Sequence, residues 1–581
     1  MITNTLQSAI QQALADLKIK LETAELTQPA NDTFGDWSSN VVLGAVKLTD
    51  QFKNSRQLAQ KIVENLKKSL KNNPDIADIS LAGAGFINFT LSKTYWLTTL
   101  AKLTKSQALT DLIPQLNGKT IIVEYSSPNI AKPFTVGHLR STIIGDAIAN
   151  LYQALGWSVH RDNHIGDWGT QFGKLIYAIK TWGNKEEISQ MVRPIKELVK
   201  LYVRFHQEAT DNDSLENFGR EWFKKLENGD SEARVIWQWC VELSWQEFDR
   251  IYTELKVTFT ENNGRGFGES FFENRMDQIL EILEEKLPQE QFEENGGYYG
   301  EGENGAKLIF FQDERLPSLM IVKKDGATLY VTRDLATDYF RLKNYHSPTL
   351  IVNEVGAEQS LYFKQLYKVE EMLGWYRPDQ RVHVKHGLYR FKDKKMSTRK
   401  GDVIWLEDVI NEAKERALAI APDKPTTATQ VAIGALKWND LKSEAVHNLT
   451  FSWEEILSMK GNSGPYVQYA AVRAASVLTK AKLKLAVPPN YDFNPEELAL
   501  IRQLDRFGPV VQKSAAEFAP HHLSLFLFEL AQRFNTFYNR HPILTAKLAE
   551  QKNARLALTA VTRFILTEGL SLLGIETPEE M

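Results

Sequence analysis

Side chains that suit a phosphate group gather in one loop of the sequence. The apolar run 121–123 predicts a buried strand, and apolar residues that recur every four positions from Leu139 to Leu155 predict a helix. Between them lie the polar, loop-forming residues 126–129. In a parallel α/β sheet such a loop sits at the carboxyl edge of the strands, where ligands bind. A helix that begins near Gly137 would direct its free N–H groups at an anion.

Two side chains add donors to this predicted anion site. Lys132 lies in the loop and brings a positive charge, and His138 lies in the first turn of the predicted helix. The alternative is an ordinary helix start with a Lys and a His nearby by chance, since strand–loop–helix junctions are common. A second phosphate-suited segment would favour the first interpretation.

A basic segment far downstream is the candidate for this second phosphate-binding segment. Eight Lys or Arg residues and a single acid, Asp393, occur between Arg381 and Lys400. Such a run is usually a solvated face or a disordered tail. Here the small residues of the segment 394–402 interrupt the run and predict a loop that can close over a polyphosphate. Two such loops on one α/β scaffold indicate a nucleotide held between them.

The ends of the chain predict two further regions around this scaffold. Residues 1–112 predict a small α+β module, with helices near 6–17 and 58–70 and a short strand at 85–89. From about residue 405 to 581, long amphipathic patterns predict an all-helical region. The two loops would then belong to the middle of the chain.

The middle of the chain predicts an α/β fold that is split by insertions. Helical, Trp-rich sequence followed by Glu- and Gly-rich sequence predicts insertions at about 181–310. Three apolar runs, 308–310, 319–322 and 350–352, predict the strands with which the α/β fold resumes.

Length and composition are typical of a soluble protein with several domains. The 581 residues suggest three or four domains. The single cysteine, Cys240, excludes an internal disulfide and a multi-cysteine zinc site, so we expect no zinc and interpret Cys240 as a packing residue. No apolar run approaches the ~20 residues that span a bilayer, and no secretory signal is evident, so we expect a cytoplasmic protein without a membrane partner. With a net charge of −4, only local basic patches could meet a nucleic acid.

Together the two loops resemble the paired signatures of class I aminoacyl-tRNA synthetases. Residues 135–138, Thr-Val-Gly-His, resemble the HIGH motif, and residues 395–398, Lys-Met-Ser-Thr, resemble the KMSK loop. HIGDWGTQFG at 164–173, GATLYVTRDLATDY at 326–339 and the SSPNIAKPF that precedes the first motif resemble the arginyl-tRNA synthetase family. This resemblance extends from about Phe34 to Met581.

The resemblance implies a fold and a reaction. The fold would be α/β, a Rossmann-like parallel-sheet catalytic domain at 113–404 with insertions at about 181–310. An additional α+β domain at 1–112 would contact the D-loop of tRNA, and an all-α bundle of DALR type at 405–581 would bind the anticodon. The reaction would join L-arginine to ATP as arginyl-adenylate, with Mg²⁺ beside the phosphates. Arginine would then pass to the 3′ end of tRNA(Arg), and we expect a monomer.

The resemblance also implies a catalytic set and an ATP-binding set. The catalytic residues would be Lys132, His138 and Lys395. The ATP-binding residues would be Thr135, Gly137, His138, Lys394, Met396, Ser397 and Lys400. Two positions depart from the family pattern, because Thr135 replaces the first His of HIGH and Thr398 replaces the last Lys of KMSK. These departures concern the strength of catalysis more than its type.

Carboxylates are the expected partners of an arginine substrate, because a guanidinium pairs with them in fork geometry. Glu124 ends the first predicted strand, and Asp334 follows Tyr330 by four residues, so that on a helix both would line one face. By match to the family, the arginine-binding set is Glu124, Asn129, Tyr330, Asp334 and Gln359. No editing domain is apparent in the sequence.

Two groups of residues are candidates for contact with tRNA. By resemblance, Phe86 would stack on a splayed base and Asn88 would hydrogen-bond its edge. Tyr466, Tyr469 and Arg473 fall on one face of a predicted helix and can stack on anticodon bases. The alternative for the aromatic residues is that they pack in a core.

Two other functions compete with an arginine ligase. A catalytically weak or silent paralogue that binds tRNA would account for Thr135 and Thr398, but it would not need the carboxylates Glu124 and Asp334. A class I synthetase for another amino acid is the third possibility, against which the two carboxylates and Tyr330 favour arginine.

Overall fold

The structure is a computed structural model that describes residues 2–21, 23–29, 32–212, 214–302, 305–324, 326–391, 404–481 and 485–581. Its internal contacts divide the chain into two compact units. Unit 1 comprises Met1–Leu112, Ala470–Gly508 and Phe528–Thr567, and unit 2 comprises Ile113–Tyr469, Pro509–Leu527 and Glu568–Met581. Each unit has its own buried apolar residues and is described by itself.

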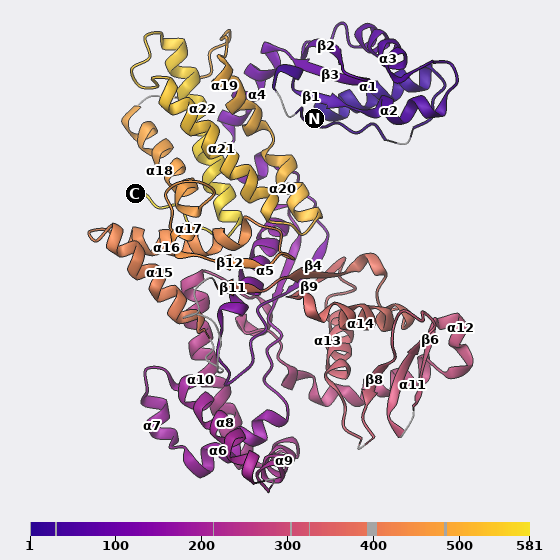
Figure 1. Cartoon of the computed structure of the whole chain (residues 1–581), viewed down its shortest axis with the longest axis vertical. Coiled ribbons are helices and arrows are strands. Elements are labelled where there is room, and N and C mark those ends of the chain that lie inside the picture. Colours follow the sequence, from indigo (N-terminus) through magenta and orange to yellow (C-terminus); the bar gives the residue numbers. More distant parts are fainter. Residues whose placement is uncertain are drawn as a thin grey trace. The chain divides into compact units, whose positions relative to one another are not determined.

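A four-stranded parallel sheet forms the centre of unit 2 (Figure 1). Its strand order is β10–β9–β4–β5, and Val123 of β4 pairs with Val352 on one side and Arg161 on the other. The run 121–123 is fully buried, which confirms the strand that the sequence predicts. The strands are β4 (Thr120–Glu124), β5 (Ser158–Asp162), β9 (Leu350–Gly356) and β10 (Arg381–His386).

Helix α5 (Val136–Ala154) connects β4 to β5 and packs closely on the chain that leaves β4. Most of its residues are buried, which agrees with the apolar repeat in its sequence. At Gly145 the approach is so close that an added Cβ would lie 2.2 Å from Cβ of Tyr125. Tyr125 is itself fully buried. Glycine is therefore required at this position for the helix to cover the strand.

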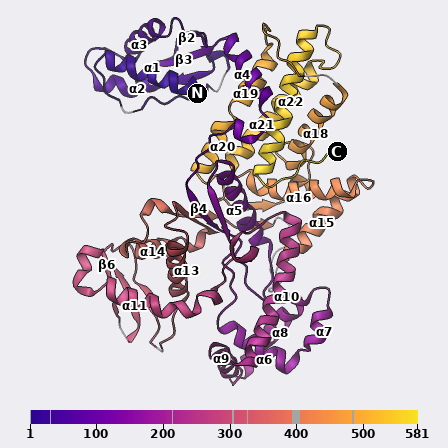
Figure 2. The ribbon, with the colours of Figure 1, turned by 180° about the vertical axis from the view of Figure 1, so that it is seen from behind.

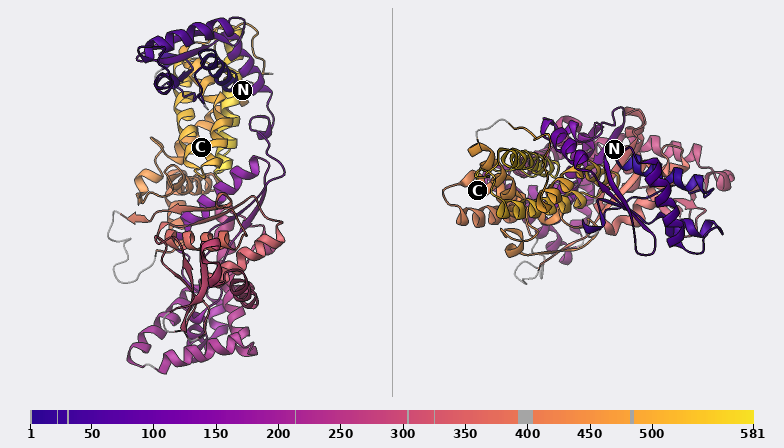
Figure 3. Two further views of the ribbon diagram at one scale, coloured as in Figure 1. Left: turned by 90° about the vertical axis from the view of Figure 1, so that its right-hand side faces the viewer. Right: turned by 90° about the horizontal axis from the view of Figure 1, so that it is seen from above.

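A cluster of helices follows β5, as the sequence predicts (magenta in Figures 1 and 3). The longest, α10, carries Cys240, whose thiol is fully buried, and burial raises its pKa to about 12. This agrees with a packing role for that residue. The helices are α6 (Thr170–Trp182), α7 (Lys185–Gln190), α8 (Pro194–Asp211), α9 (Ser214–Glu227) and α10 (Ser231–Leu255).

Two of the three apolar runs that were expected to resume the parallel sheet lie in a different sheet, so that prediction was wrong. The runs 308–310 and 319–322 belong to an antiparallel sheet of order β6–β7–β8, and only 350–352 lies in the parallel sheet. A run of three or four apolar residues fits either kind of strand, so its sequence cannot choose between them. These elements are η5 (Glu269–Arg275), α11 (Met276–Lys286), α12 (Phe292–Asn295), β6 (Gly297–Glu301), β7 (Lys307–Phe311) and β8 (Leu319–Val322).

Helix α13 (Tyr330–Asn344) brings the chain from β8 back to the parallel sheet. Together with α11 and α14 (Ser360–Met372) it packs against the antiparallel sheet, and Leu335, Ile309 and Leu366 lie in their common core. Figure 2 shows these elements from behind. This packing holds the first turns of α13 in place beside the carboxyl edge of the parallel strands.

The C-terminal part of the chain is almost entirely helical, as predicted. The helices α15 (Leu406–Ile420), α16 (Pro425–Leu441), α17 (Trp453–Ile456), α18 (Gly464–Ala481), α19 (Pro495–Asp505), α20 (Phe507–Ala516), α21 (His521–Arg540) and α22 (Ala549–Leu572) make up this part. Two short parallel strands, β11 (Tyr389–Phe391) and β12 (Leu449–Phe451), are the exception. Close helix contacts rely on small residues, since a Cβ at Gly569 would lie 2.5 Å from Leu527.

The N-terminal module of unit 1 is an antiparallel sheet covered by helices. The sheet order is β1–β3–β2, and Ile87 and Phe89 of β3 are buried against Leu6 and Ile62 of the helices. The predicted helices and strand are confirmed here. The elements are α1 (Ile2–Asp16), β1 (Trp37–Ser39), α2 (Val41–Ala45), α3 (Ser55–Ser69), β2 (Ile76–Ala82), β3 (Phe86–Leu91) and α4 (Lys93–Lys105). Among the residues described in either unit, no helix is long and apolar enough to cross a bilayer.

Candidate active site

The loop between β4 and α5 has an unusual backbone. Ser126, Ser127 and Ala131 are not glycines, yet they have φ angles of 73°, 43° and 55°. Such left-handed conformations cost on the order of 1–3 kcal/mol each and persist only where the surroundings hold them, often at functional sites. The loop that carries Asn129 and Lys132 is therefore held in place by its neighbours.

Hydrogen bonds to two other segments hold this loop. The Ser127 N–H donates to Oδ1 of Asn163 at 3.0 Å, and the Ala131 N–H donates to Oγ of Ser244 at 2.9 Å. The Ile130 N–H donates to the carbonyl oxygen of Gly166 at 3.1 Å. The partners lie after β5 and on α10, so the inserted helices help to shape the loop. The sequence alone does not identify these partners, because they are far from the loop in the chain.

His138 lies in the first turn of α5 in a defined tautomer. The Thr135 N–H donates to Nδ1 of His138 at 3.0 Å, so this nitrogen accepts and the ring proton is on Nε2. Burial lowers the pKa of His138 to about 4. The imidazole is therefore neutral at pH 7, and its Nε2–H, with the exposed Gly137 next to it, can donate to a phosphate oxygen.

Lys132 is half-buried beside the same loop. Burial lowers the pKa of its ammonium, and the carboxylate of Glu269 opposes this shift. A cation that is only partly solvated interacts more strongly with an anion than a fully solvated one does. This environment agrees with the predicted role of Lys132 near phosphate but does not test it.

The loop that resembles KMSK lies outside the described residues. Lys394, Lys395, Met396, Ser397, Thr398 and Lys400 all belong to the segment 392–403. The described chain beyond this segment runs beside the start of α5. The Val136 N–H donates to the carbonyl oxygen of Ile404 at 3.1 Å, and the Leu406 N–H donates to that of Phe134 at 2.9 Å. The chain that follows the basic segment, from Ile404 on, is thus adjacent to the first predicted phosphate-binding loop.

All five predicted arginine-binding residues line one pocket at the carboxyl edge of the sheet. Its volume is about 260 Å³, and Glu124, Asn129, Tyr330, Asp334 and Gln359 are all among its lining residues. Tyr330 and Asp334 lie one turn apart on α13, which confirms the predicted helix. Tyr330 and Gln359 are exposed at the rim, whereas the other three are buried or half-buried. The fold therefore brings together residues that are more than 200 positions apart in sequence.

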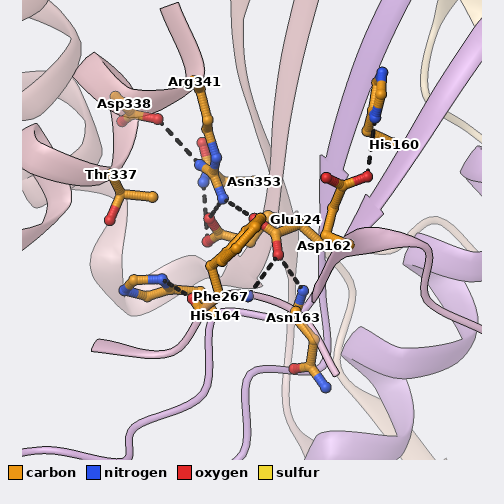
Figure 4. A network of polar contacts seen from close by, with 12 residues as sticks. Glu124, His160, Asp162, Asn163, His164, Phe267, Thr337, Asp338, Arg341 and Asn353 are labelled. Carbon is orange, nitrogen blue, oxygen red and sulfur yellow. Dashed lines mark hydrogen bonds and ion pairs between the residues drawn. The ribbon is translucent and has the colours of Figure 1, made fainter. Parts of the chain in front are cut away.

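Glu124 is paired with a guanidinium of the protein itself (Figure 4). Its Oε2 accepts from Arg341 at 2.5 Å, and its Oε1 accepts from Asn353 at 3.0 Å. Burial raises the pKa of this carboxyl, but Arg341 and His164 together outweigh burial and keep the pKa below its usual value. Arg341 also pairs with Asp162 and Asp338. Glu124 is therefore ionised but already partly neutralised.

At Asp334, in contrast to Glu124, burial outweighs the neighbouring positive charges. Its Oδ2 accepts a hydrogen bond from the hydroxyl of Tyr362, and His164 lies 3.6 Å from its Oδ1. Among the described residues, no Lys or Arg forms an ion pair with it, and burial raises its pKa. His164 is its nearest basic group, and the charge of that ring depends on protonation, so the permanent charge of a ligand guanidinium would stabilise this buried carboxylate further. Asp334 is therefore the pocket's main candidate partner for a substrate cation.

Several residues of the pocket were missed by sequence reasoning. They are His164, Glu269, Arg341, Asn353 and Tyr362. Only His164 had a signal, because it begins the segment HIGDWGTQFG. The others lie on helices and strands whose register the sequence does not reveal.

The predicted tRNA contacts differ in their exposure. Phe86 is 40% exposed at the start of β3, so it is accessible for stacking, whereas Asn88 is only 3% exposed in the central strand. Tyr466, Tyr469 and Arg473 are half-buried on α18. Arg473 donates to Asn535 at 2.5 Å and lies 4.9 Å from the ring of Tyr538. Contact of these residues with tRNA stays a prediction, and the burial of Asn88 does not favour it.

Three family profiles match the chain. The profile for the arginyl tRNA synthetase N terminal domain matches residues 4–91. That for tRNA synthetases class I (R), catalytic domain, matches residues 100–453, and that for the DALR anticodon binding domain matches residues 467–581. The three matches cover most of the chain and follow one another without overlap.

Relatives and solved structures agree with these profiles. The chain is 37% identical to an arginine--tRNA ligase of Clostridioides difficile over 99% of both chains. It is 39% identical to one of Streptococcus pneumoniae over 100% of this chain and 99% of that one. An arginyl-tRNA synthetase structure from Plasmodium falciparum superposes with a TM-score of 0.81 and 25% identity over 100% and 99% of the two chains. One from Thermus thermophilus has the same fold, with a TM-score of 0.81 and 24% identity over 100% of both chains.

The predicted fold class is confirmed by the parallel sheet, the inserted helices and the likeness to these structures. The pocket adds that the five residues predicted to bind arginine lie together in this chain. The chain belongs to the arginyl-tRNA synthetase family of class I aminoacyl-tRNA synthetases.

Proposed function

We propose that the protein is an arginine–tRNA ligase. It activates L-arginine with ATP to arginyl-adenylate and pyrophosphate, and then transfers arginine to the 3′ end of tRNA(Arg). One observation carries the substrate assignment, namely the half-buried carboxylate of Asp334, which has no Lys or Arg partner among the described residues of its pocket. A substrate guanidinium would supply the missing charge, and full-length relatives named arginine--tRNA ligase support the same conclusion.

The pocket would hold arginine by both ends. Asp334 would pair with the guanidinium, while Tyr330 at the rim and the remaining lone pairs of Glu124 would complete its hydrogen bonds. Asn129, on the strained loop next to α5, would hold the α-amino group, and Gln359 would close the rim. The carboxylate of arginine would then point toward the start of α5. A pocket whose polar groups require a guanidinium rejects apolar amino acids strongly, so no editing site is needed.

The start of α5 would bind the phosphates of ATP. His138 would donate through Nε2–H, and the N–H of Gly137 in the first turn would face the same oxygens. Lys132 would add charge as pyrophosphate leaves, because Thr398 replaces a lysine of the motif. The protein's part in this step is to align the carboxylate with the α-phosphate and to stabilise the charge that develops there.

Mg²⁺ would enter with ATP and reduce the negative charge of its phosphates. In the described part of the chain, no group of three or more His, Cys, Asp or Glu side chains could hold a metal ion. The ATP phosphates would therefore supply much of its coordination. ATP as a substrate follows from the family, whereas Mg²⁺ belongs to the proposal.

The proposal extends to the outer regions of the chain. An N-terminal domain at 1–112 would contact the D-loop of tRNA through Phe86, and a helical domain at 405–581 would bind the anticodon near Tyr466 and Tyr469. The catalytic domain between them would span 113–404. A single buried cysteine suits a reducing compartment, so we place the protein in the cytoplasm, and we propose a monomer.

Aminoacylation with purified protein tests the proposal. The assay supplies total tRNA, ATP and Mg²⁺ with each of the amino acids in turn and measures acid-precipitable charged tRNA. Charging with arginine alone is the expected result. Charging with another amino acid would point to a different class I synthetase. No charging across a range of Mg²⁺ and tRNA concentrations would favour the silent paralogue.

A further inference from the structure

His164 enters the pocket in a fixed orientation (Figure 4). Its Nδ1 lies 3.0 Å from the carbonyl oxygen of Phe267. A carbonyl oxygen only accepts, so Nδ1 must carry a proton in every state of the ring. The opposite nitrogen, Nε2, is buried without a hydrogen-bond partner among the described residues and lies 3.6 Å from Oδ1 of Asp334. In the neutral ring, Nε2 therefore presents a lone pair to the pocket.

The backbone around His164 keeps the ring in this orientation. Oδ1 of Asp162 accepts from the N–H groups of Asn163 and Phe267 at 2.9 Å and 3.1 Å. The Glu269 N–H donates to the carbonyl oxygen of Ile165 at 3.0 Å. The residues on both sides of His164 are thus tied to the segment that supplies the carbonyl group of Phe267. The direction of Nε2 is set by the protein and does not depend on a ligand.

We propose that His164 recognises arginine directly, by accepting an N–H of the substrate guanidinium at Nε2, and that arginine binding displaces a proton from this ring. The inference rests on the proposed function and adds a residue and a pH response to its pocket. A guanidinium has five N–H donors in one plane, and the carboxylates of Asp334 and Glu124 already accept hydrogen bonds from other side chains of the protein, so Nε2 adds an acceptor to the pocket. Nε2 of the neutral ring is the acceptor that the pocket offers next to Asp334.

The charges that face His164 explain why a proton is present before arginine binds. The strongest are Glu124, Asp334 and Glu269, which are negative, and Arg341, which is positive, and the carboxyl group of Asp167 also faces the ring. Burial lowers the pKa of His164, but the three carboxylates outweigh burial and Arg341, so that the pKa is raised. A bound guanidinium would neutralise two of these carboxylates and place a like charge beside the ring. The pKa of His164 would then fall, and the proton would leave.

The sign of the pH response follows from linkage. Between the lower pKa of His164 with arginine bound and its higher pKa in the free protein, binding releases protons. Arginine affinity therefore rises with pH in this window, by at most tenfold per pH unit from one group, and levels off above it. Asp334 and Glu269 can also release protons, because burial raises the pKa of both. The contribution of His164 must be isolated by substitution.

Two substitutions distinguish the hydrogen bond accepted by Nε2 from the release of a proton by the ring. Gln places an amide oxygen or nitrogen close to the position of Nε2, whereas Asn places its amide near Nδ1 and leaves the position of Nε2 empty. His164→Gln should bind arginine at high pH within about threefold of the wild type, with fewer protons released. His164→Asn should lose arginine affinity by about tenfold or more, because a hydrogen bond to a charged group is lost.

His160, in the strand β5 that precedes His164, provides a matched control (Figure 4). Its Nδ1 lies 2.9 Å from Oε1 of Glu261, its ring contacts Tyr345, and it does not line the pocket. His160→Gln removes an imidazole near His164 without touching the pocket. It should leave both arginine affinity and proton release unchanged.

Isothermal titration of the full-length protein with L-arginine, in buffers of different ionisation enthalpy from pH 6 to 8.5, counts the protons released. The proposal expects the wild type and His160→Gln to release more protons than His164→Gln, by up to one. Equal release by wild type and His164→Gln, or unchanged affinity in His164→Asn, would overturn it. NMR titration of the wild-type imidazoles gives a readout that needs no variant, and an unchanged His164 pKa on arginine addition would also overturn the proposal. If the wild type binds no arginine at any pH, the proposed function itself fails.

Discussion

Replacing Asp334 by Asn removes the charge that the proposed function assigns to the substrate guanidinium. The amide keeps the size of the side chain and an oxygen that can accept from Tyr362. His138, Gly137 and the rest of the proposed ATP site are unchanged. The substitution should therefore weaken the binding of arginine selectively and leave the binding of ATP intact.

The structure sets the expected size of this effect. Removing one partner of a desolvated charge pair costs about 2–5 kcal/mol. The side chain of Asp334 is 25% exposed, which places the loss in the lower part of that range, at about 2–3 kcal/mol. This corresponds to a roughly 30- to 150-fold rise in the Kd for arginine.

Stability supplies a second readout for the same variant. Burial raises the pKa of Asp334, so the ionised carboxylate lowers the stability of the folded protein at pH 7. This destabilisation develops as the pH rises above the ordinary pKa of an aspartate. Asn removes this cost, so the unfolding midpoint should stay the same or rise while arginine affinity falls. A fall in both would indicate a structural role instead.

Calorimetric titration with arginine and with ATP measures both affinities, and Asp379→Asn serves as the control. Asp379 is a surface carboxylate, 70% exposed and paired with Arg377. The control should change neither Kd. Equal losses of arginine and ATP affinity in Asp334→Asn, or an unchanged arginine Kd, would refute the reasoning that assigns Asp334 to the substrate cation.

Three further predictions concern α5 and the loop that precedes it. Burial lowers the pKa of His138 from 6.5 to about 4, so as the pH falls from 6.5 the imidazole takes up a proton in the unfolded state before it does so in the folded state. The free energy of unfolding, measured with denaturant, should therefore fall by up to about 3 kcal/mol between pH 6.5 and 4. His138→Asn should reduce this loss. Lys132→Ala should lower pyrophosphate exchange, measured with tRNA present, on the order of tenfold to a hundredfold and weaken ATP binding less; an unchanged rate would make Lys132 a solvated loop residue. Gly145→Ala should lower the free energy of unfolding in urea by about 1–3 kcal/mol, because its Cβ would overlap Tyr125, whereas Gly44→Ala, with nothing within 4 Å of the new Cβ, should raise it by about 0.4–1 kcal/mol.

The sequence predicts the strand and the helix on either side of the first loop well, because the change of hydrophobic period there is local. The apolar run 121–123 and the repeat from Leu139 to Leu155 each specify one element, and α5 begins at Val136, one residue before the predicted start. The runs 308–310 and 319–322 carry no comparable signal. Their pairing depends on which strand lies beside them, and that is decided by tertiary contacts.

The charge balance of the pocket could not be predicted in the same way. In the sequence analysis, Glu124 and Asp334 are equivalent carboxylates, and both are predicted to bind the substrate guanidinium. In the structure Arg341, which lies 217 positions after Glu124, forms an ion pair with Glu124, whereas the partners of Asp334 are Tyr362 and His164. Such pairings depend on strand order and helix rotation, so only the fold distinguishes the two acids.

A crystal structure of the protein with L-arginine tests the central claim most directly, because it locates the guanidinium. The account predicts that its nitrogens lie within hydrogen-bond distance of Asp334, with the α-amino group at Asn129 and the carboxylate toward His138. Arginine ordered at another site, or bound in this pocket with its guanidinium turned away from Asp334, would contradict it.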